Sequence, residues 1–344
     1  MYKFLGKILI FLLVPALLLE LVSRTVVGKD WYENHFYLAA KKELQSQTAL
    51  LIFVGSSRTA TAIDSEYLSE RLSRDLNQKI LVLNMGQGYS TLTEHYFGIK
   101  RALAYRGSFK NVIFVVEAAH GFPLMNEWHG SWVLEEAPQI IMPVLNSKEI
   151  FEMWKISSMD PGLKTLISSG RYLLSARYFH RFRRLIQALP EQIFARYRQE
   201  HDSVGIREAG GVSNSARALF LTRETVKSQF ELLKKHPQSC PDFADSVFIS
   251  LTDLLKANEA ELLTYVPPQS SLDIQNLSYY RCSDFKNAFE AFCRKKSLKQ
   301  LSVPTSFPDR DFPDLLHLNK PNSLIFTKTL ADELLPVCRS YFSQ

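Results

Sequence analysis

Two short segments of the chain hold side chains that together could perform acyl transfer. The first is Gly55-Ser56-Ser57-Arg58-Thr59, which follows an apolar run. A glycine there lets the chain turn sharply, and the serines then lie beside backbone N–H groups that favour a developing negative charge. Ser56 and Ser57 both fit a nucleophile chemically. Taken alone, a Gly-Ser-Ser turn is also a common connection between a strand and a helix.

The second segment is Asp314-Leu315-Leu316-His317-Leu318-Asn319. An aspartate and a histidine at this spacing in a turn can place the carboxylate against Nδ1 of the imidazole. This contact fixes the tautomer and leaves Nε2 to accept a proton from a serine. Many solvated turns contain the same spacing, so the segment points to chemistry only together with the serines.

A third segment, Asn84-Met85-Gly86-Gln87-Gly88-Tyr89-Ser90, follows another apolar run. Gly86 or Gly88 could bring a backbone N–H close to a ligand and donate it to an oxyanion. The segment lacks the G-x-G-x-x-G order and a lysine, so nucleotide binding is not indicated.

The elements around these segments predict a parallel α/β sheet. Three short, apolar, β-prone runs are the expected strands, at residues 50–54, 80–83 and 111–116. Helices are expected between them, one with a leucine stripe after an N-cap at Asp64 and one after the capping-box pair Thr91 and Glu94. Strands and helices in this alternation favour a sheet covered on both faces, with the loops after its strands forming the site.

The α/β pattern stops in the middle of the chain and then resumes. Residues 48–119 form the first part of the expected α/β domain, residues 120–244 a mainly helical insertion or cap, and residues 245–344 the second part. The second part is expected to contain a helix at 243–258, a strand at 261–266, a helix at 283–296, a strand at 299–303 and a helix at 323–335.

Residues 1–28 are typical of a signal anchor. Lys3 and Lys7 precede an apolar stretch just long enough to cross a bilayer, and no small-residue cleavage site follows it. A transmembrane helix with a linker helix at 29–47 is therefore expected, and it would display the rest of the chain outside the cytoplasm, in the periplasm or at the cell surface. A cleaved signal peptide and a buried N-terminal helix are the alternatives.

Composition and charge exclude several classes of protein. A hydrophobic content of 46% and a net charge of +6 are those of a globular chain. Its basic clusters belong to no nucleic-acid motif, so no nucleic-acid partner is expected. His95, His120 and His129 show no metal-ligand pattern, and neither a metal nor a cofactor is expected. The four cysteines form no CxxC pair and permit either structural disulfides or inert thiols.

The three segments, in this order, resemble the blocks of the SGNH (GDSL-like) hydrolase superfamily. The resemblance covers roughly residues 48–118 and 245–340, with Ser56 in place of the usual aspartate. It implies a three-layer, flavodoxin-like sheet and a Ser-His-Asp triad of Ser57, His317 and Asp314. It also implies an oxyanion hole formed by the N–H groups of Ser57 and of Gly86 or Gly88.

One block of the superfamily, G-x-N-D, is missing, because the third strand is followed by Glu117-Ala118-Ala119-His120. Membrane-anchored relatives in envelope acylation, of the DltD type or among polysaccharide O-acetylation factors, often lack it too. Glu117 is then a structural carboxylate or a substrate contact, and Arg58 and Asn84 are further candidate substrate contacts.

These observations lead to two expectations about function. The first is an extracytoplasmic serine esterase or O-acyltransferase that acts on acyl esters or envelope polymers, beside the membrane and an integral-membrane acyl donor protein. The second, favoured by the missing block, is a non-catalytic accessory or scaffold protein of an envelope-modification complex.

Overall fold

The computed structural model describes most of one of two compact units. The units are residues 1–35 with 125–207, and residues 36–124 with 208–344. The described residues are 41–46, 48–86, 92–118, 247–272 and 285–342, with single positions at 14, 18, 151, 154, 155 and 227. The predicted anchor and insertion therefore lie almost wholly outside them. In the part of the chain that is described, no helix is long and apolar enough to cross a membrane.

A parallel sheet of five strands forms the centre of the second unit. Its strands, in spatial order, are β2 (Ile80–Gly86), β1 (Ala49–Gly55), β3 (Val112–Glu117), β4 (Glu261–Tyr265) and β6 (Lys299–Gln300), and every neighbouring pair is parallel. The order 2-1-3-4-5 is that of a common doubly wound sheet. The predicted parallel α/β architecture is confirmed.

Strands β1 and β3 are buried along their whole length. Near-continuous runs of leucine, isoleucine, valine and phenylalanine suit this position, because a central parallel strand is covered on both faces. The carboxyl ends of β1 and β2 meet where Gly55 pairs with Gly86, and those of β3 and β4 where Glu117 pairs with Tyr265. The four strand ends therefore lie at one edge of the sheet.

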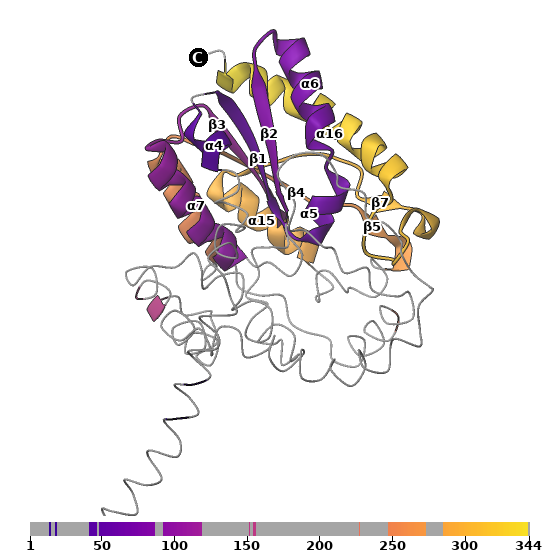
Figure 1. The fold of residues 1–344 in the computed structure, drawn as a ribbon. Coiled ribbons are helices and arrows are strands. Elements are labelled where there is room, and N and C mark those ends of the chain that lie inside the picture. The colour runs from indigo at the N-terminus through magenta and orange to yellow at the C-terminus, as the bar shows by residue number, and fades with distance from the viewer. Residues whose placement is uncertain are drawn as a thin grey trace, which may run out of the picture. The chain divides into compact units, whose positions relative to one another are not determined.

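Helices cover both faces of the sheet and give it three layers (Figure 1). One face is covered by α5 (Ser57–Ala62) and α6 (Ser65–Leu76), which pack on β2, and by α16 (Lys320–Phe342), which packs on α5 and α6. The other is covered by α7 (Leu92–Arg106), α13 (Val247–Ala257) and α15 (Phe285–Lys296), with the short α4 (Lys41–Gln45) against α7.

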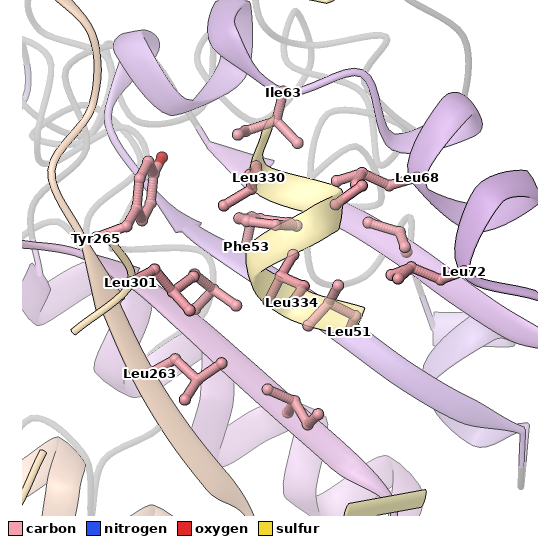
Figure 2. Packing of buried hydrophobic residues seen from close by; sticks show 14 of the residues in the cluster. Leu51, Phe53, Ile63, Leu68, Leu72, Leu263, Tyr265, Leu301, Leu330 and Leu334 are labelled. Atoms are coloured by element: carbon pink, nitrogen blue, oxygen red, sulfur yellow. The ribbon is translucent and has the colours of Figure 1, made fainter. Parts of the chain in front are cut away.

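A hydrophobic core lies between the sheet and helices α6 and α16 (Figure 2). Leu51 and Phe53 of β1 point into it, and Leu330 and Leu334 of α16 face them. The predicted stripe of α6 contributes Leu68, and Asp64 caps this helix by accepting from the Tyr67 N–H, as expected. The amphipathic pattern thus fixes how α6 packs on the sheet.

The last helix is longer than its predicted span of 323–335. α16 continues through Pro336 to Phe342. The prediction ended at the proline, which lacks an N–H and crowds the carbonyl four residues earlier. Both Pro336 and Asp332 are exposed, so water can satisfy the freed carbonyl, while Val337 and Cys338 beyond the proline are buried. Burial of this last segment outweighs the cost of the proline.

Three short elements also differ from the prediction. β6 covers only the first two residues of the strand expected at 299–303. β5 (Gln269–Ser270) and β7 (Ser306–Phe307) form a separate parallel pair that was not predicted. Strands of two residues show no alternation in sequence, so pattern arguments cannot find them.

Two of the four cysteines lie in the described residues, and both are free thiols. Cys293 of α15 and Cys338 of α16 are buried. Burial raises the pKa of Cys293 to about 11 and that of Cys338 to about 12. Both thiols are therefore protonated at neutral pH and inert as nucleophiles.

Candidate active site

Ser57 lies in the first turn of α5, directly after β1. Ser56 is the N-cap, and its hydroxyl accepts from the Arg58 N–H at 3.2 Å, as serines at this position commonly do. Strand β1 lies between β2 and β3, so this turn sits where the strand order reverses. Ligand sites of open parallel sheets form at that point. Ser57 itself is partly exposed.

Asp314 and His317 lie in the loop before α16. One carboxylate oxygen of Asp314 accepts from the N–H groups of Leu316 (3.0 Å) and His317 (2.8 Å), which closes the loop. Leu315 adopts a left-handed backbone with φ 70°. The other carboxylate oxygen lies 2.5 Å from His317 Nδ1. Asp314 thus fixes both the backbone and the ring of the same histidine.

The imidazole of His317 joins this loop to the β1 turn. Its Nε2 lies 2.7 Å from Ser57 Oγ, across 260 residues of sequence. The side chains of His317 and Asp314 are almost fully buried. Burial alone would raise the pKa of Asp314, but hydrogen bonds from His317 and from the two backbone amides, with the charge of His317, lower it below its usual value.

The structure therefore brings the three predicted residues into one hydrogen-bonded chain, Ser57–His317–Asp314. Since the ionised aspartate faces Nδ1, that nitrogen carries the proton and Nε2 accepts from the serine hydroxyl. This arrangement can remove the serine proton during attack on a carbonyl and stabilise the imidazolium that results.

Hydrogen bonds tie the loop and α16 to the rest of the site. The buried hydroxyl of Ser270 in β5 donates to the Leu315 carbonyl at 2.8 Å. At the start of α16, the hydroxyls of Ser323 and Thr327 donate to the Ala62 carbonyl at the end of α5. The elements that hold the histidine and the serine are thus joined directly.

Asn84 and Gly86 are hydrogen-bonded to each other, and the Asn84 side chain also binds carbonyl groups in and just after α5. The Asn84 side chain donates to the carbonyls of Thr59 (3.1 Å) and Ile63 (3.0 Å), which lie in and just after α5, and accepts from the Gly86 N–H at 3.0 Å. A Cβ at Gly86 would come within 2.8 Å of Thr59 Cβ, so β2 and α5 need a glycine here. The amide of Asn84 thus joins β2 to α5, and the Gly86 N–H expected to face an oxyanion is hydrogen-bonded to it. Gly88 lies outside the described residues.

Glu117, at the end of β3, is a fully buried carboxylate beneath the turn. It accepts from the Ser56 N–H (2.8 Å), the Ser56 hydroxyl (2.9 Å) and the Thr59 hydroxyl. Thr59 Oγ1 lies 2.6 Å from the Tyr265 hydroxyl of β4. Figure 2 shows that hydroxyl pointing away from Leu263 and Leu301. Burial raises the pKa of Glu117, partly offset by these hydrogen bonds and by the charge of Arg58.

This network is what a structural role for Glu117 requires. The side chain has no exposed surface, and its carboxylate is bound to the residues of the turn. The Arg58 side chain is only 8% exposed, and its charge acts on Glu117. Sequence reasoning missed Thr59 and Tyr265; the one available signal was a glutamate at the end of a wholly apolar strand.

His95 is a further buried polar side chain at the turn. It lies in α7 with its Nε2 3.0 Å from the Gly55 carbonyl oxygen, a contact that sequence reasoning missed. His120 and His129 lie outside the described residues. Within those residues, no cluster of histidine, cysteine, aspartate or glutamate could hold a metal ion.

Neither a protein-family model nor a curated protein matches the chain.

Proposed function

We propose that this chain is a serine esterase or O-acyltransferase that acts on acyl esters. Ser57 is the nucleophile, His317 the general base and Asp314 the residue that orients and stabilises the imidazole. The observation that supports this most strongly is the continuous chain of hydrogen bonds from Ser57 Oγ through His317 to Asp314.

In the first half-reaction, His317 Nε2 takes the hydroxyl proton as Ser57 Oγ attacks the ester carbonyl. The tetrahedral intermediate collapses when His317 returns the proton to the leaving alcohol, and an acyl-serine remains. In the second half, His317 takes a proton from water or an acceptor hydroxyl, whose oxygen attacks the acyl-serine. The bond from the acyl carbon to Ser57 Oγ then breaks, and His317 returns the proton to the serine. The Ser57 N–H, in the first turn of α5, is the proposed oxyanion donor, with Gly88 as the second.

The wider setting follows from the resemblance to SGNH hydrolases. The strand order is the flavodoxin-like order that the resemblance implies. Residues 1–28 are proposed to anchor the domain outside the cytoplasm, where the acyl group would come from or go to an envelope polymer. Fusion of alkaline phosphatase to residues 1–47 tests this placement, because that enzyme is active only outside the cytoplasm. A fusion protein that is folded but inactive would refute it.

A non-catalytic role in binding or scaffolding is the second candidate. The observation in its favour is that the Gly86 N–H, expected to face an oxyanion, donates to Asn84 instead. A protein of this kind would keep the fold and the hydrogen-bonded residues without turnover.

Hydrolysis of p-nitrophenyl acetate separates the two candidates. The esterase predicts turnover by the wild type, loss to background in Ser57→Ala, and full activity in Ser340→Ala, an exposed serine at the far end of α16. If the folded wild type is no faster than Ser57→Ala, the hydrolase proposal fails for this ester, and the scaffold role gains support.

A further inference from the structure

The peptide bond between Gly55 and Ser56 is held from both sides by buried side chains. On one side, His95 Nε2 lies 3.0 Å from the Gly55 carbonyl oxygen. On the other, the Ser56 N–H donates to Glu117 Oε2 at 2.8 Å. Because a carbonyl oxygen only accepts, His95 must carry a proton on Nε2. One histidine and one glutamate thus fix the plane of the peptide one residue before Ser57.

Glu117 also binds the chain after Ser57. It accepts from the hydroxyls of Ser56 and Thr59, and the Ser56 hydroxyl in turn accepts from the Arg58 N–H. The residues on both sides of Ser57 are therefore tied to one carboxylate. Tyr265 supports this arrangement from β4 through its 2.6 Å contact with Thr59.

The sequence makes room for this carboxylate. A Cβ on Gly55 would come within 2.8 Å of the Glu117 Cβ and would also overlap its carboxylate and the Thr59 hydroxyl. The glycine before the serines is thus needed for the approach of β3, whose last residue reaches under the turn. Any residue with a side chain at position 55 would therefore clash with the buried network.

A buried carboxylate is a costly way to fill space, since its burial opposes ionisation. An apolar side chain could fill the end of β3 at a lower cost in free energy, as apolar side chains do along the rest of the strand. What the carboxylate adds is three directed hydrogen bonds to the residues around Ser57. Displacing a reacting group by about 1 Å can cost about 100-fold in rate.

We propose that Glu117 and His95 are positioning residues that hold the Gly55–Ser56 peptide, and thereby Ser57 Oγ, in line with His317. Neither residue touches the reacting atoms. The inference rests on the proposed function, because it assigns these side chains to the reaction at Ser57.

The test compares Glu117→Ala, Glu117→Gln and His95→Leu with the wild type, using the full chain and p-nitrophenyl acetate. Phe114→Leu is the matched control, since Phe114 is equally buried in β3 but packs against Phe109. Glu117→Ala is expected to lower kcat by about 100-fold, with KM changed less than about twofold because the residue does not contact substrate.

Glu117→Gln keeps an acceptor for the Ser56 N–H and should recover part of kcat. His95→Leu removes the contact with the Gly55 carbonyl oxygen instead. It allows the proposal to be tested if the Glu117 variants do not fold.

A general loss of packing would lower the melting temperature of Phe114→Leu and the Glu117 variants alike without lowering kcat per folded molecule. The proposal is overturned if Glu117→Ala or His95→Leu retains wild-type kcat while folded. It is also overturned if Glu117→Gln is no better than Glu117→Ala.

A crystal structure of Glu117→Ala, or of His95→Leu, gives a readout that does not need activity. The proposal expects Ser57 Oγ to move away from its 2.7 Å contact with His317 Nε2. If the contact is unchanged, the positioning role is wrong even where the wild type is active. If the wild type is inactive but the contact is lost in the variant, the proposed function fails and the positioning holds.

Discussion

At the scale of single residues, His317 depends on one neighbour for both its place and its protonation. Asp314 accepts two backbone N–H groups with one oxygen and faces the imidazole with the other. The first contact sets where the ring lies, and the second sets which nitrogen is free. The two effects can be separated by a substitution that keeps one oxygen and replaces the other.

Asp314→Asn is expected to lower the rate of Ser57 acylation by about 10⁴-fold, the loss typical of a triad whose histidine is held in the wrong tautomer. The amide oxygen still closes the loop, but the NH₂ group faces Nδ1 and forces the proton onto Nε2. Acylation by p-nitrophenyl acetate measures the effect. Asp332→Asn, an exposed aspartate near Arg71, is the matched control. Equal rates for Asp314→Asn and the wild type would contradict the proposed mechanism.

Glu117 predicts a pH dependence of stability with a definite sign. Burial raises its pKa in the folded chain, whereas the pKa in the unfolded chain is about 4.3. Between these two pKa values the native state binds more protons than the unfolded state. The wild type therefore loses stability as pH rises from about 4.3 to the folded pKa, by about 1.4 kcal/mol for each pH unit between them. Glu117→Gln lacks this loss.

Urea unfolding of both proteins from pH 4 upward checks this prediction. The free energy of unfolding of the wild type, minus that of Glu117→Gln, should fall with rising pH and then level off. Asp314 titrates equally in both proteins and cancels in the difference. A difference that rises with pH would mean that the pKa of Glu117 is lowered.

At the scale of elements, α16 is the part that brings the two halves of the site together. It packs on α5 and α6, and its first turns bond to the end of α5. The loop with Asp314 and His317 leads directly into it. The helix continues past Pro336 because its last turns bury Val337, Cys338 and Phe342.

Pro336→Ala is expected to raise the free energy of unfolding by up to about 3 kcal/mol, since alanine restores the N–H and removes the clash of the ring. The site lies at the opposite end of α16, so the rate of Ser57 acylation should not change. Chemical denaturation measures the gain. Ser340→Ala on the same helix should add only about 0.5 kcal/mol. If Pro336→Ala is no more stable than the wild type, Pro336 does not destabilise the helix and the prediction is wrong.

At the scale of the whole molecule, the sequence predicted what local patterns determine. The strands β1 to β4 were found near their observed bounds because each is a short apolar run between turn residues. The sequence also predicted that Ser57, Asp314 and His317 would lie together, because of their residue types and their order along the chain, and the three are in contact. The parallel register brings the ends of β1, β2 and β3 to one edge of the sheet, and His317 reaches the turn after β1 from the loop before α16.

What the sequence could not show depends on contacts between distant elements. Glu117, Thr59 and Tyr265 come from three elements and meet only in the folded sheet. The hydrogen bond from the Gly86 N–H to Asn84 depends on the rotamer of the Asn84 side chain. The spacing of residues in the sequence does not determine that rotamer. The strands β5 and β7 pair over two residues each, which is too short a span for a pattern in the sequence.

The most direct test of Ser57 as the nucleophile is labelling with a fluorophosphonate, followed by peptide mapping of the modified residue. The proposed mechanism predicts one label per folded chain, on Ser57, and none in Ser57→Ala. A folded wild type that stays unlabelled, or a label that persists in Ser57→Ala, would contradict it; in the second case Ser56 would be the first residue to test.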